Sequence, residues 1–278
     1  MIAHRFKYSC PRSAEEAAAE LAQMEGEETA IISGGTWVVP EMSHHLRRPK
    51  LVIDLKLAGL AGVSAEADAV VIGPATTYTQ LAHSKHTPNF LKKVVAGITG
   101  GSQIRNRGTI GGSACYANPA SDIPGALVTM KASLHLRAHS STRIVEAADF
   151  FLDANVTLLE PDEILESISI PSTNDENLFS YAKFKTAQGS WPIVTIGCIA
   201  SEDGVARRVI VGGAGAIPFA VDLDGQESED EVLQRVHAAM RQPWSDVFAT
   251  ADTRRHIAGV MTQRAVREIA AAKNGEKS

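Results

Sequence analysis

The sequence predicts an α+β protein built from two domains. Strands and helices are mixed in the second half of the chain without a regular βαβ period, which argues against a doubly wound parallel sheet. The segment Ser172–Asn177 is polar, has no hydrophobic period, and separates two stretches that each hold several elements. The chain has 278 residues, which suffices for two modest hydrophobic cores. We therefore expect a first domain over residues 1–172 and a second over residues 173–278.

The elements of the first domain follow from one helix-capping signal and from short apolar runs. Ser13 is followed by Glu16, a capping-box pattern that predicts a helix to about Met24. Apolar runs predict buried strands, and one alternating run stops at Pro171, as a strand would. The strands expected are 29–32, 51–55, 69–73, 134–138 and 166–170, and the further helices are 79–84, 91–97 and one that ends near 131.

The second domain is expected to contain three strands and two helices. Its last helix is amphipathic, with apolar residues recurring on one face. A glycine-rich run, 209–218, follows a strand as a nucleotide-binding loop would, but Pro218 stands where a helix should start, so we interpret the run as a turn. The strands expected lie near 179–184, 193–200 and 208–211, and the helices at about 229–241 and 253–272.

Two pairs of neighbouring glycines are the strongest functional signal. One is in Ser33-Gly34-Gly35-Thr36, after an apolar strand, and the other is in Thr109-Ile110-Gly111-Gly112-Ser113. Such glycines let the backbone take positive φ and approach a ligand closely, while consecutive free N–H groups and flanking hydroxyls bind anions. A single pair is more often a plain turn. Two pairs in one domain suit a diphosphate held from both sides, which indicates a dinucleotide bound without a Rossmann fingerprint.

Composition argues against several other classes. The net charge of −5 gives no basis for binding nucleic acid or an anionic membrane surface, and no apolar stretch reaches the ~20 residues of a membrane span. The cysteines, Cys10, Cys115 and Cys198, are too few for an iron–sulfur cluster, which takes about four thiolates. Their odd number does not suggest a disulfide framework. A cytoplasmic location is expected.

Longer motifs resemble those of one protein family. The run Gln103–Ser113, with Asp122 nine residues on, closely resembles the FAD-binding subunits of molybdenum hydroxylases. These are the medium subunits of the carbon monoxide dehydrogenase type, equivalent to the flavin domain of xanthine dehydrogenase. Ser33–Thr36 resembles the other phosphate loop of the family, Glu163–Pro171 the strand that closes its flavin domain, and Arg254–Met261 the helix that closes its C-terminal domain. The resemblance spans nearly the whole chain.

This resemblance implies a fold and a cofactor. The fold would be a two-part FAD-binding domain of the PCMH type, with parts at about residues 1–55 and 56–172. A smaller α+β domain, in which an antiparallel sheet packs with helices, would follow. The cofactor would be FAD, with its diphosphate at the two glycine pairs. The residues that the resemblance implies around FAD are Ile32, Ser33, Gly34, Gly35, Thr36, Trp37, Thr109, Ile110, Gly111, Gly112, Ser113, Ser121, Asp122, Leu165, Lys185 and Trp191.

Some of these residues have individual expected roles. Asp122 would accept hydrogen bonds from the hydroxyls of the flavin's sugar-like chain, although it or Ser121 could instead cap a helix. Leu165 would pack near the isoalloxazine ring. Lys185 would lie near the polar edge of that ring, where a cation favours negative charge on reduced flavin; an exposed strand lysine is the alternative. Trp191 could cover the ring or belong to the core.

The resemblance also implies a division of labour between subunits. The chain would be the electron-transfer subunit of a molybdenum-containing hydroxylase or dehydrogenase, and thus an FAD-dependent oxidoreductase subunit. A small subunit with [2Fe–2S] clusters would supply electrons, a large subunit would carry the molybdenum cofactor, and the flavin would pass electrons to an external acceptor. A dimer of such heterotrimers is expected. No metal site and no catalytic residue are expected in this chain, because substrate oxidation would take place in the large subunit.

Two other functions are open on the sequence alone. A non-catalytic assembly subunit could keep the fold and lose FAD, although the intact glycine pairs argue against it. A stand-alone flavin oxidase of the related vanillyl-alcohol type would need an added substrate domain, for which 278 residues leave little room. The substrate of the complex and its acceptor, whether NAD, a quinone or oxygen, stay open.

Overall fold

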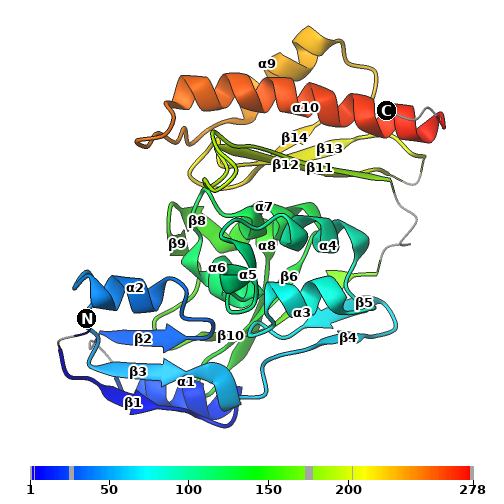
Figure 1. Ribbon diagram of the computed structural model, residues 1–278. Coiled ribbons are helices and arrows are strands. Elements are labelled where there is room, and N and C mark those ends of the chain that lie inside the picture. The colour runs from blue at the N-terminus through cyan, green and yellow to red at the C-terminus, as the bar shows by residue number, and fades with distance from the viewer. Residues whose placement is uncertain (1, 3, 25–27, 173–177, 202, 276–278) are drawn as a thin grey trace.

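A computed structural model of the chain describes residues 2, 4–24, 28–172, 178–201 and 203–275. Its described strands form three larger sheets and one hairpin, and Figure 1 shows the C-terminal sheet with its two helices above the other elements. Each of the three larger sheets contributes to a hydrophobic core of its own. The expected α+β class is confirmed. None of the described helices combines the length and the apolar character needed to cross a bilayer.

The first sheet is small and parallel, with strand order β1-β3-β2. Helix α1 packs Ala14, Ala17 and Leu21 against this sheet. The elements of this part are β1 Lys7–Ser9, α1 Ala14–Ala22, β2 Thr29–Ile32, α2 Val38–Ser43, β3 Leu51–Asp54 and the short 3-10 helix η1 Leu55–Leu57. The loop from β2 to α2 contains the first glycine pair, so the parallel sheet presents that pair at the end of a strand.

The start of α1 forms only half of the expected capping box. Ser13 Oγ accepts a hydrogen bond from the amide of Glu16 at 3.1 Å, as predicted. The Glu16 carboxylate reaches one residue further back than the pattern requires and accepts from the amide of Arg12 at 2.6 Å. A complete capping box occurs at helix α3, Tyr78–His83, between Thr77 and Gln80.

The second sheet is antiparallel, with strand order β4-β5-β10-β6-β7. Its core lies between the sheet and the helices that follow β5, where Ile168 and Ile170 of β10 pack with Leu134 and Leu136 of β6. The elements of this part are β4 Val63–Ala65, β5 Ala69–Ile72, α3 Tyr78–His83, α4 Asn89–Ala96, α5 Gly101–Arg105, α6 Ile110–Tyr116, α7 Asp122–Thr129, β6 Ser133–Arg137, β7 Thr142–Glu146, α8 Ala147–Phe150, the hairpin of β8 Phe151–Asp153 and β9 Val156–Thr157, and β10 Ile164–Pro171.

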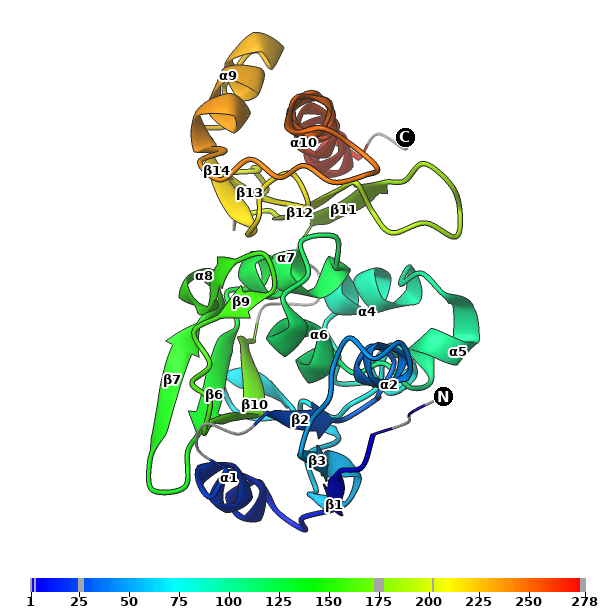
Figure 2. The same ribbon diagram turned by 90° about the vertical axis from the view of Figure 1, so that its left-hand side faces the viewer.

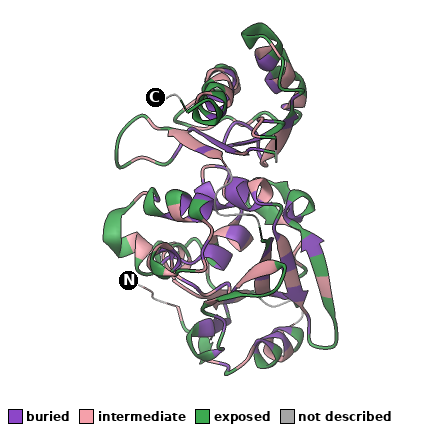
Figure 3. Cartoon of the chain, turned by 90° about the vertical axis from the view of Figure 1, so that its right-hand side faces the viewer, coloured by how far each residue is buried: buried purple, intermediate pink, exposed green. Residues whose placement is uncertain are grey.

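The third sheet is antiparallel, with strand order β11-β12-β13-β14. Helices α9 and α10 cover one of its faces, whereas α4 and α7 lie against the other (Figure 2). Buried residues are concentrated where this sheet meets α7, as Figure 3 shows. The elements of this part are β11 Phe179–Phe184, β12 Val194–Ile199, β13 Arg208–Gly212, β14 Phe219–Asp222, α9 Glu229–Ala239 and α10 Ala251–Lys273.

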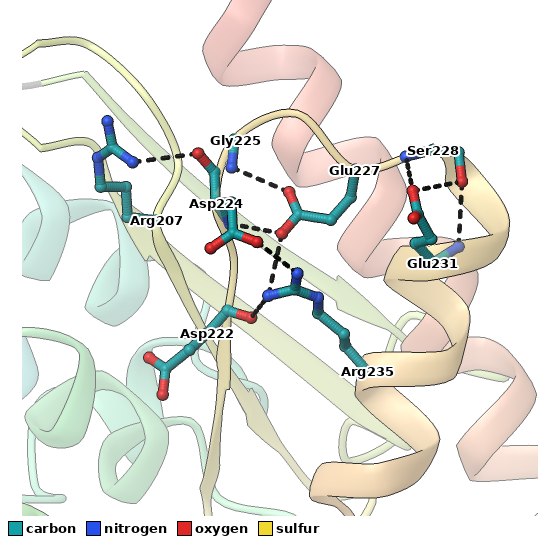
Figure 4. A network of polar contacts seen from close by, with 8 residues as sticks. All are labelled: Arg207, Asp222, Asp224, Gly225, Glu227, Ser228, Glu231 and Arg235. Carbon is teal, nitrogen blue, oxygen red and sulfur yellow. Dashed lines mark hydrogen bonds and ion pairs between the residues drawn. The ribbon is translucent and has the colours of Figure 1, made fainter.

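A polar network shapes the turn between β14 and α9 (Figure 4). The carboxylate of Glu227 accepts hydrogen bonds from the amides of Asp224 and Gly225 and pairs with Arg235 of α9 at 3.1 Å. Backbone donation holds the pKa of Glu227 below its usual value against the effect of burial. Ser228 then caps α9 in a second complete capping box. The network therefore directs the chain back over the sheet.

Short elements account for most of the differences from the sequence prediction. The predicted strands and helices are all present, within a few residues of their expected limits. Of the predicted junction Ser172–Asn177, residues 173–177 lie outside the described residues, and the domain limits stay predictions. The run 209–218 is a strand followed by a turn, as expected. The elements absent from the sequence prediction are β1, β4, β7, β8, β9, β14, α2, α5, α6, α8 and η1.

Candidate cofactor-binding site

One cavity of about 760 Å³ collects most of the residues that the sequence singles out. Its walls come from the loop after β2, the first turns of α6 and α7, the N-terminal end of β10 and the loop between β11 and β12. The cavity therefore lies where the first sheet, the second sheet and the C-terminal part meet. Its volume falls within the range of small-molecule and cofactor pockets.

All but three of the expected residues line this cavity: Ser33, Gly34, Gly35, Thr36, Trp37, Thr109, Gly111, Gly112, Ser113, Ser121, Asp122, Leu165 and Trp191. The exceptions are Ile32, Ile110 and Lys185. Ile32 is the last residue of β2, and Ile110 is fully buried at the start of α6. Lys185 Nζ donates to the hydroxyl of Thr99 at 3.1 Å and to the carbonyl of Gln188. Thr99 lines the cavity, so the ammonium of Lys185 contacts a wall residue without lining the cavity itself. Its contact with a flavin stays a prediction.

The first glycine pair forms an open loop. None of the backbone N–H groups of Gly34–Trp37 donates to a described residue, and the buried Ser33 Oγ has no hydrogen-bond partner among the described residues. Gly35 has a φ of +70°, which glycine adopts without steric cost. Buried polar groups are normally hydrogen-bonded, so the orphaned hydroxyl and the unused amides indicate that a ligand accepts from them. The loop fits a diphosphate.

The second glycine pair is the first turn of helix α6. Thr109 is the N-cap, and its Oγ1 accepts from the amide of Gly112 at 3.2 Å. The amide of Gly111 donates to the carbonyl of Pro74 at 2.9 Å, and each amide over 110–113 donates within the chain. The expected row of free N–H groups at this pair is therefore wrong, because the neighbouring backbone and the capping hydroxyl take up these donors.

Close packing between backbone segments explains why two of the glycines are needed. A Cβ on Gly34 would lie 1.9 Å from the carbonyl oxygen of Arg107, and a Cβ on Gly111 would lie 2.3 Å from Cβ of Pro74. Neither residue has a positive φ. The first pair is thus glycine in part so that its loop can pack against the segment leading to the second. We expected the missing side chains of these two glycines to make room for a ligand. The structure shows that they make room for Arg107 and Pro74 of the chain itself.

Asp122 joins the cavity to the C-terminal part of the chain. It is the first residue of α7, and the helix is capped by Ser121, whose Oγ accepts from the amide of Ile123 at 3.4 Å. The Asp122 side chain is 6% exposed and pairs through Oδ1 with Lys183 Nζ at 2.9 Å. The same oxygen accepts from the hydroxyl of Tyr181. No described residue donates to Oδ2, and Asp122 is part of the cavity wall.

Burial and the charge of Asp122 set the protonation of two nearby tyrosines. Burial raises the pKa of Tyr181 well above its usual value, and the negative charge of Asp122 adds to this effect. Burial likewise raises the pKa of Tyr78, which lines the cavity and hydrogen-bonds Ser113, to about 12. Both phenols are neutral at physiological pH, and the Tyr181 hydroxyl acts as a donor to the carboxylate.

Three aromatic side chains gather on the cavity wall. The ring centroid of Trp37 lies 4.6 Å from that of Tyr116 and 6.1 Å from that of Trp191, which it meets edge-on at 81°. Trp191 is 43% exposed, so it is not part of the core. Its contact with Trp37 connects the loop between β11 and β12 to the first glycine loop.

A buried arginine positions the loop that carries Trp191. Arg254 of α10 is fully buried, and its Nη1 donates to the carbonyl oxygens of Ile193 at 2.6 Å and Gly213 at 2.8 Å. Its Nη2 pairs with the carboxylate of Asp246 at 2.7 Å. Since Ile193 lies two residues after Trp191, the guanidinium fixes the end of this loop against the sheet.

Cys115 lies in the wall but behaves as a packed thiol. Burial raises its pKa to about 12, which fits the expected packing role. The described residues contain no group of three or more His, Cys, Asp or Glu side chains that could hold a metal ion.

Several wall and support residues were missed by the sequence interpretation. They are Glu41, Arg47, Tyr78, Thr99, Tyr116, Tyr181, Lys183 and Arg254. Most of them lie outside the glycine motifs and carry no local signal. Tyr181 and Lys183 are the exception, because alternate positions on one strand share a face, and a face with a phenol and an ammonium suggests a buried acidic partner.

Comparison with known proteins connects this cavity to a family. Residues 4–173 match the family described as the FAD binding domain in molybdopterin dehydrogenase. The chain belongs to this family. The carbon monoxide dehydrogenase medium chain of Afipia carboxidovorans is 31% identical over 289 residues, covering 99% of this chain and 100% of the relative. The nicotine 6-hydroxylase medium subunit of Paenarthrobacter nicotinovorans is 29% identical over 279 residues, covering 95% and 97%.

A solved structure supports the same relationship over the whole fold. Carbon monoxide dehydrogenase from Hydrogenophaga pseudoflava, in a form lacking the Mo-pyranopterin moiety, matches with a TM-score of 0.89 at 28% identity, covering 98% of this chain and 99% of the matched chain. The resemblance inferred from the glycine motifs is confirmed. With it, the family assignment confirms FAD as the cofactor and an oxidoreductase subunit as the type of protein.

Proposed function

We propose that this chain is the electron-transfer flavoprotein of a molybdenum hydroxylase complex. It would receive electrons from [2Fe–2S] clusters of a small partner subunit and pass them to an external acceptor, while a large subunit with the molybdenum cofactor oxidises the substrate. The observation that carries the proposal is the cavity, whose wall joins unused amides of an FAD-binding domain to a buried carboxylate held by the C-terminal part. The full-length matches to relatives named as a medium chain and a medium subunit support the partners.

The residues of the wall have separate tasks in this proposal. The amides of Gly34–Trp37 and the hydroxyl of Ser33 would hold the diphosphate, and Oδ2 of Asp122 would accept from a hydroxyl of the flavin chain. Leu165 and Trp191 would contact the ring and limit access of water. When bound, FAD supplies the switch between one-electron and two-electron transfer. The chain would contribute position and electrostatics.

Co-expression with its genomic neighbours tests the proposal. The purified complex should release FAD on acid treatment and contain iron and molybdenum in addition to flavin. Under anaerobic conditions, substrate should bleach the flavin absorbance, whereas the chain expressed alone should show no hydroxylase activity. A dimer of heterotrimers should be measured by light scattering.

Each rival function gives a different result in the same experiment. Recovery of no flavin from the complex would favour an assembly subunit without FAD. Oxidation of an organic substrate by the isolated chain, at a rate that matches the complex, would favour a stand-alone oxidase. Either outcome would overturn the proposed relay.

A further inference from the structure

The charges on the cavity wall are few and mostly negative. Among the described residues that line it, the charged side chains are Glu41, Arg47 and Asp122. The charge of Asp122 is balanced by Lys183, its ion-pair partner, which does not line the cavity. A diphosphate brings two further negative charges into this space. Arg47 is therefore the one cation that the described wall offers to such a ligand.

The guanidinium of Arg47 is not committed to its neighbours. Its Nη1 lies 3.8 Å from a carboxylate oxygen of Glu41, and its Nε lies 3.8 Å from one of Glu28. Both distances exceed hydrogen-bonding range, and no described residue accepts a hydrogen bond from this side chain. The side chain is 38% exposed, and its two ion pairs with described residues are long. Its donors are available to a planar anion, for which the guanidinium fork is well matched.

Arg47 is connected to the first glycine loop through Glu41. The indole Nε1 of Trp37, the last residue of that loop, donates to Glu41 Oε1 at 2.8 Å, and the other oxygen of Glu41 faces Arg47. The charges of Glu41 and Arg47 both act on Tyr116, which contacts Trp37 and whose pKa is raised mainly by burial. The arginine, its acidic neighbour and the unused amides are thus at the same end of the cavity.

We propose that Arg47 binds the diphosphate of FAD at this loop and that Glu41 is the counter-ion that competes for it. The inference rests on the proposed FAD site and adds a residue outside the glycine motifs. When the diphosphate binds, Arg47 exchanges two long carboxylate contacts for direct phosphate contacts. The two residues then act in opposite directions: loss of Arg47 weakens FAD binding, whereas loss of the Glu41 charge strengthens it.

Flavin titrations of the full-length chain test this, after its flavin has been removed. Dissociation constants for FAD and for riboflavin, which has no phosphate, are measured by fluorescence. Arg47→Met should weaken FAD binding by about tenfold or more, as expected for a lost charge-assisted hydrogen bond, and leave riboflavin binding unchanged. Arg47→Lys should recover part of the loss. Glu41→Gln keeps the acceptor for Trp37 and should tighten FAD binding by about threefold, which is a small electrostatic gain.

Arg48→Met is the matched control, because Arg48 is the exposed neighbour that does not line the cavity. Equal FAD affinity in Arg47→Met and Arg48→Met would overturn the inference, as would an equal loss of riboflavin binding with Arg47→Met. Weaker FAD binding in Glu41→Gln would overturn the role of Glu41. If the wild-type chain binds neither flavin, the proposed FAD site itself fails, and that result is distinct from all the others.

Discussion

The carboxylate of Asp122 and the ammonium of Lys183 form a buried ion pair, 2.9 Å long, that connects helix α7 to strand β11. Lys183 also donates to the carbonyl of Gly97 at 2.6 Å, so one ammonium binds both the end of α4 and the start of α7. The same carboxylate lines the cavity. Asp122 therefore takes part both in the docking of the C-terminal part and in the wall of the cavity.

Replacing Lys183 with Met should destabilise the protein, because it leaves a buried carboxylate without its cation. Breaking a buried pair from one side costs roughly 3 kcal/mol, and the loss should appear as a lower urea midpoint and a lower flavin content. Lys185→Met is the control, since Lys185 makes no ion pair with a described residue. It should change the free energy of unfolding by under about 1 kcal/mol. Similar losses in both variants would contradict the assignment.

Gly34→Ala should lower stability and flavin content together. The new Cβ would lie 1.9 Å from the Arg107 carbonyl, so the backbone must move, and overpacking of this kind costs about 1–3 kcal/mol. Gly189→Ala also changes a glycine of the wall, but its Cβ would meet nothing within 4 Å. Thermal unfolding should separate the two variants. A stable Gly34→Ala protein with full flavin content would show that this packing is not required.

Stability should fall as the pH rises above about 10, the usual pKa of tyrosine. Burial raises the pKa of Tyr78 to about 12 and that of Tyr181 well above its usual value. The folded state therefore keeps protons that the unfolded state has released, and each phenol contributes up to about 1.4 kcal/mol per pH unit. Urea unfolding between pH 9 and 11 should show this slope. Tyr78→Phe and Tyr181→Phe should each flatten it, and an unchanged slope in both would refute the cause.

Binding of FAD should quench most of the tryptophan fluorescence. The chain has three tryptophans, and two of them, Trp37 and Trp191, line the cavity, whereas Trp244 does not. A Trp244→Phe variant should keep nearly the full quench on titration with FAD, and a variant with both Trp37→Phe and Trp191→Phe should lose most of it. The opposite pattern would place the cofactor away from the aromatic wall.

Sequence reasoning singled out most of the cavity wall that the glycine motifs form, because those motifs are local signals. A glycine pair after an apolar strand favours a turn whatever the rest of the fold. The first pair is indeed in an irregular loop after β2, as predicted. The second pair was predicted to be a loop with free amides, but it is the first turn of a helix. Threonine followed by glycines is compatible with both structures, and here Thr109 accepts from the amide of Gly112 as the N-cap. Only the carbonyl of Pro74, which is remote in sequence, shows that the amide of Gly111 is occupied.

The lysine assignment could not be made from the sequence for a geometric reason. Lys183 lies in β11 and Lys185 follows the last residue of that strand, yet the Nζ of each reaches a residue of the preceding part of the chain, Asp122 for Lys183 and Thr99 for Lys185. Which of them reaches Asp122 depends on how far the strand extends over α7, and that is a tertiary property. Arg254 was missed for the same reason, since the carbonyl of Ile193 that it binds is 61 residues away in the chain.

The cavity wall joins Trp37 to Trp191, more than 150 residues apart in the chain. A ribosome adds about 5–20 residues per second, so the first glycine loop precedes its partner by roughly 8–30 s during synthesis. Throughout that interval the nascent chain has the first glycine loop but no completed cavity. The complete cavity is therefore a late product of synthesis, formed when β11 has emerged and Lys183 can reach α7.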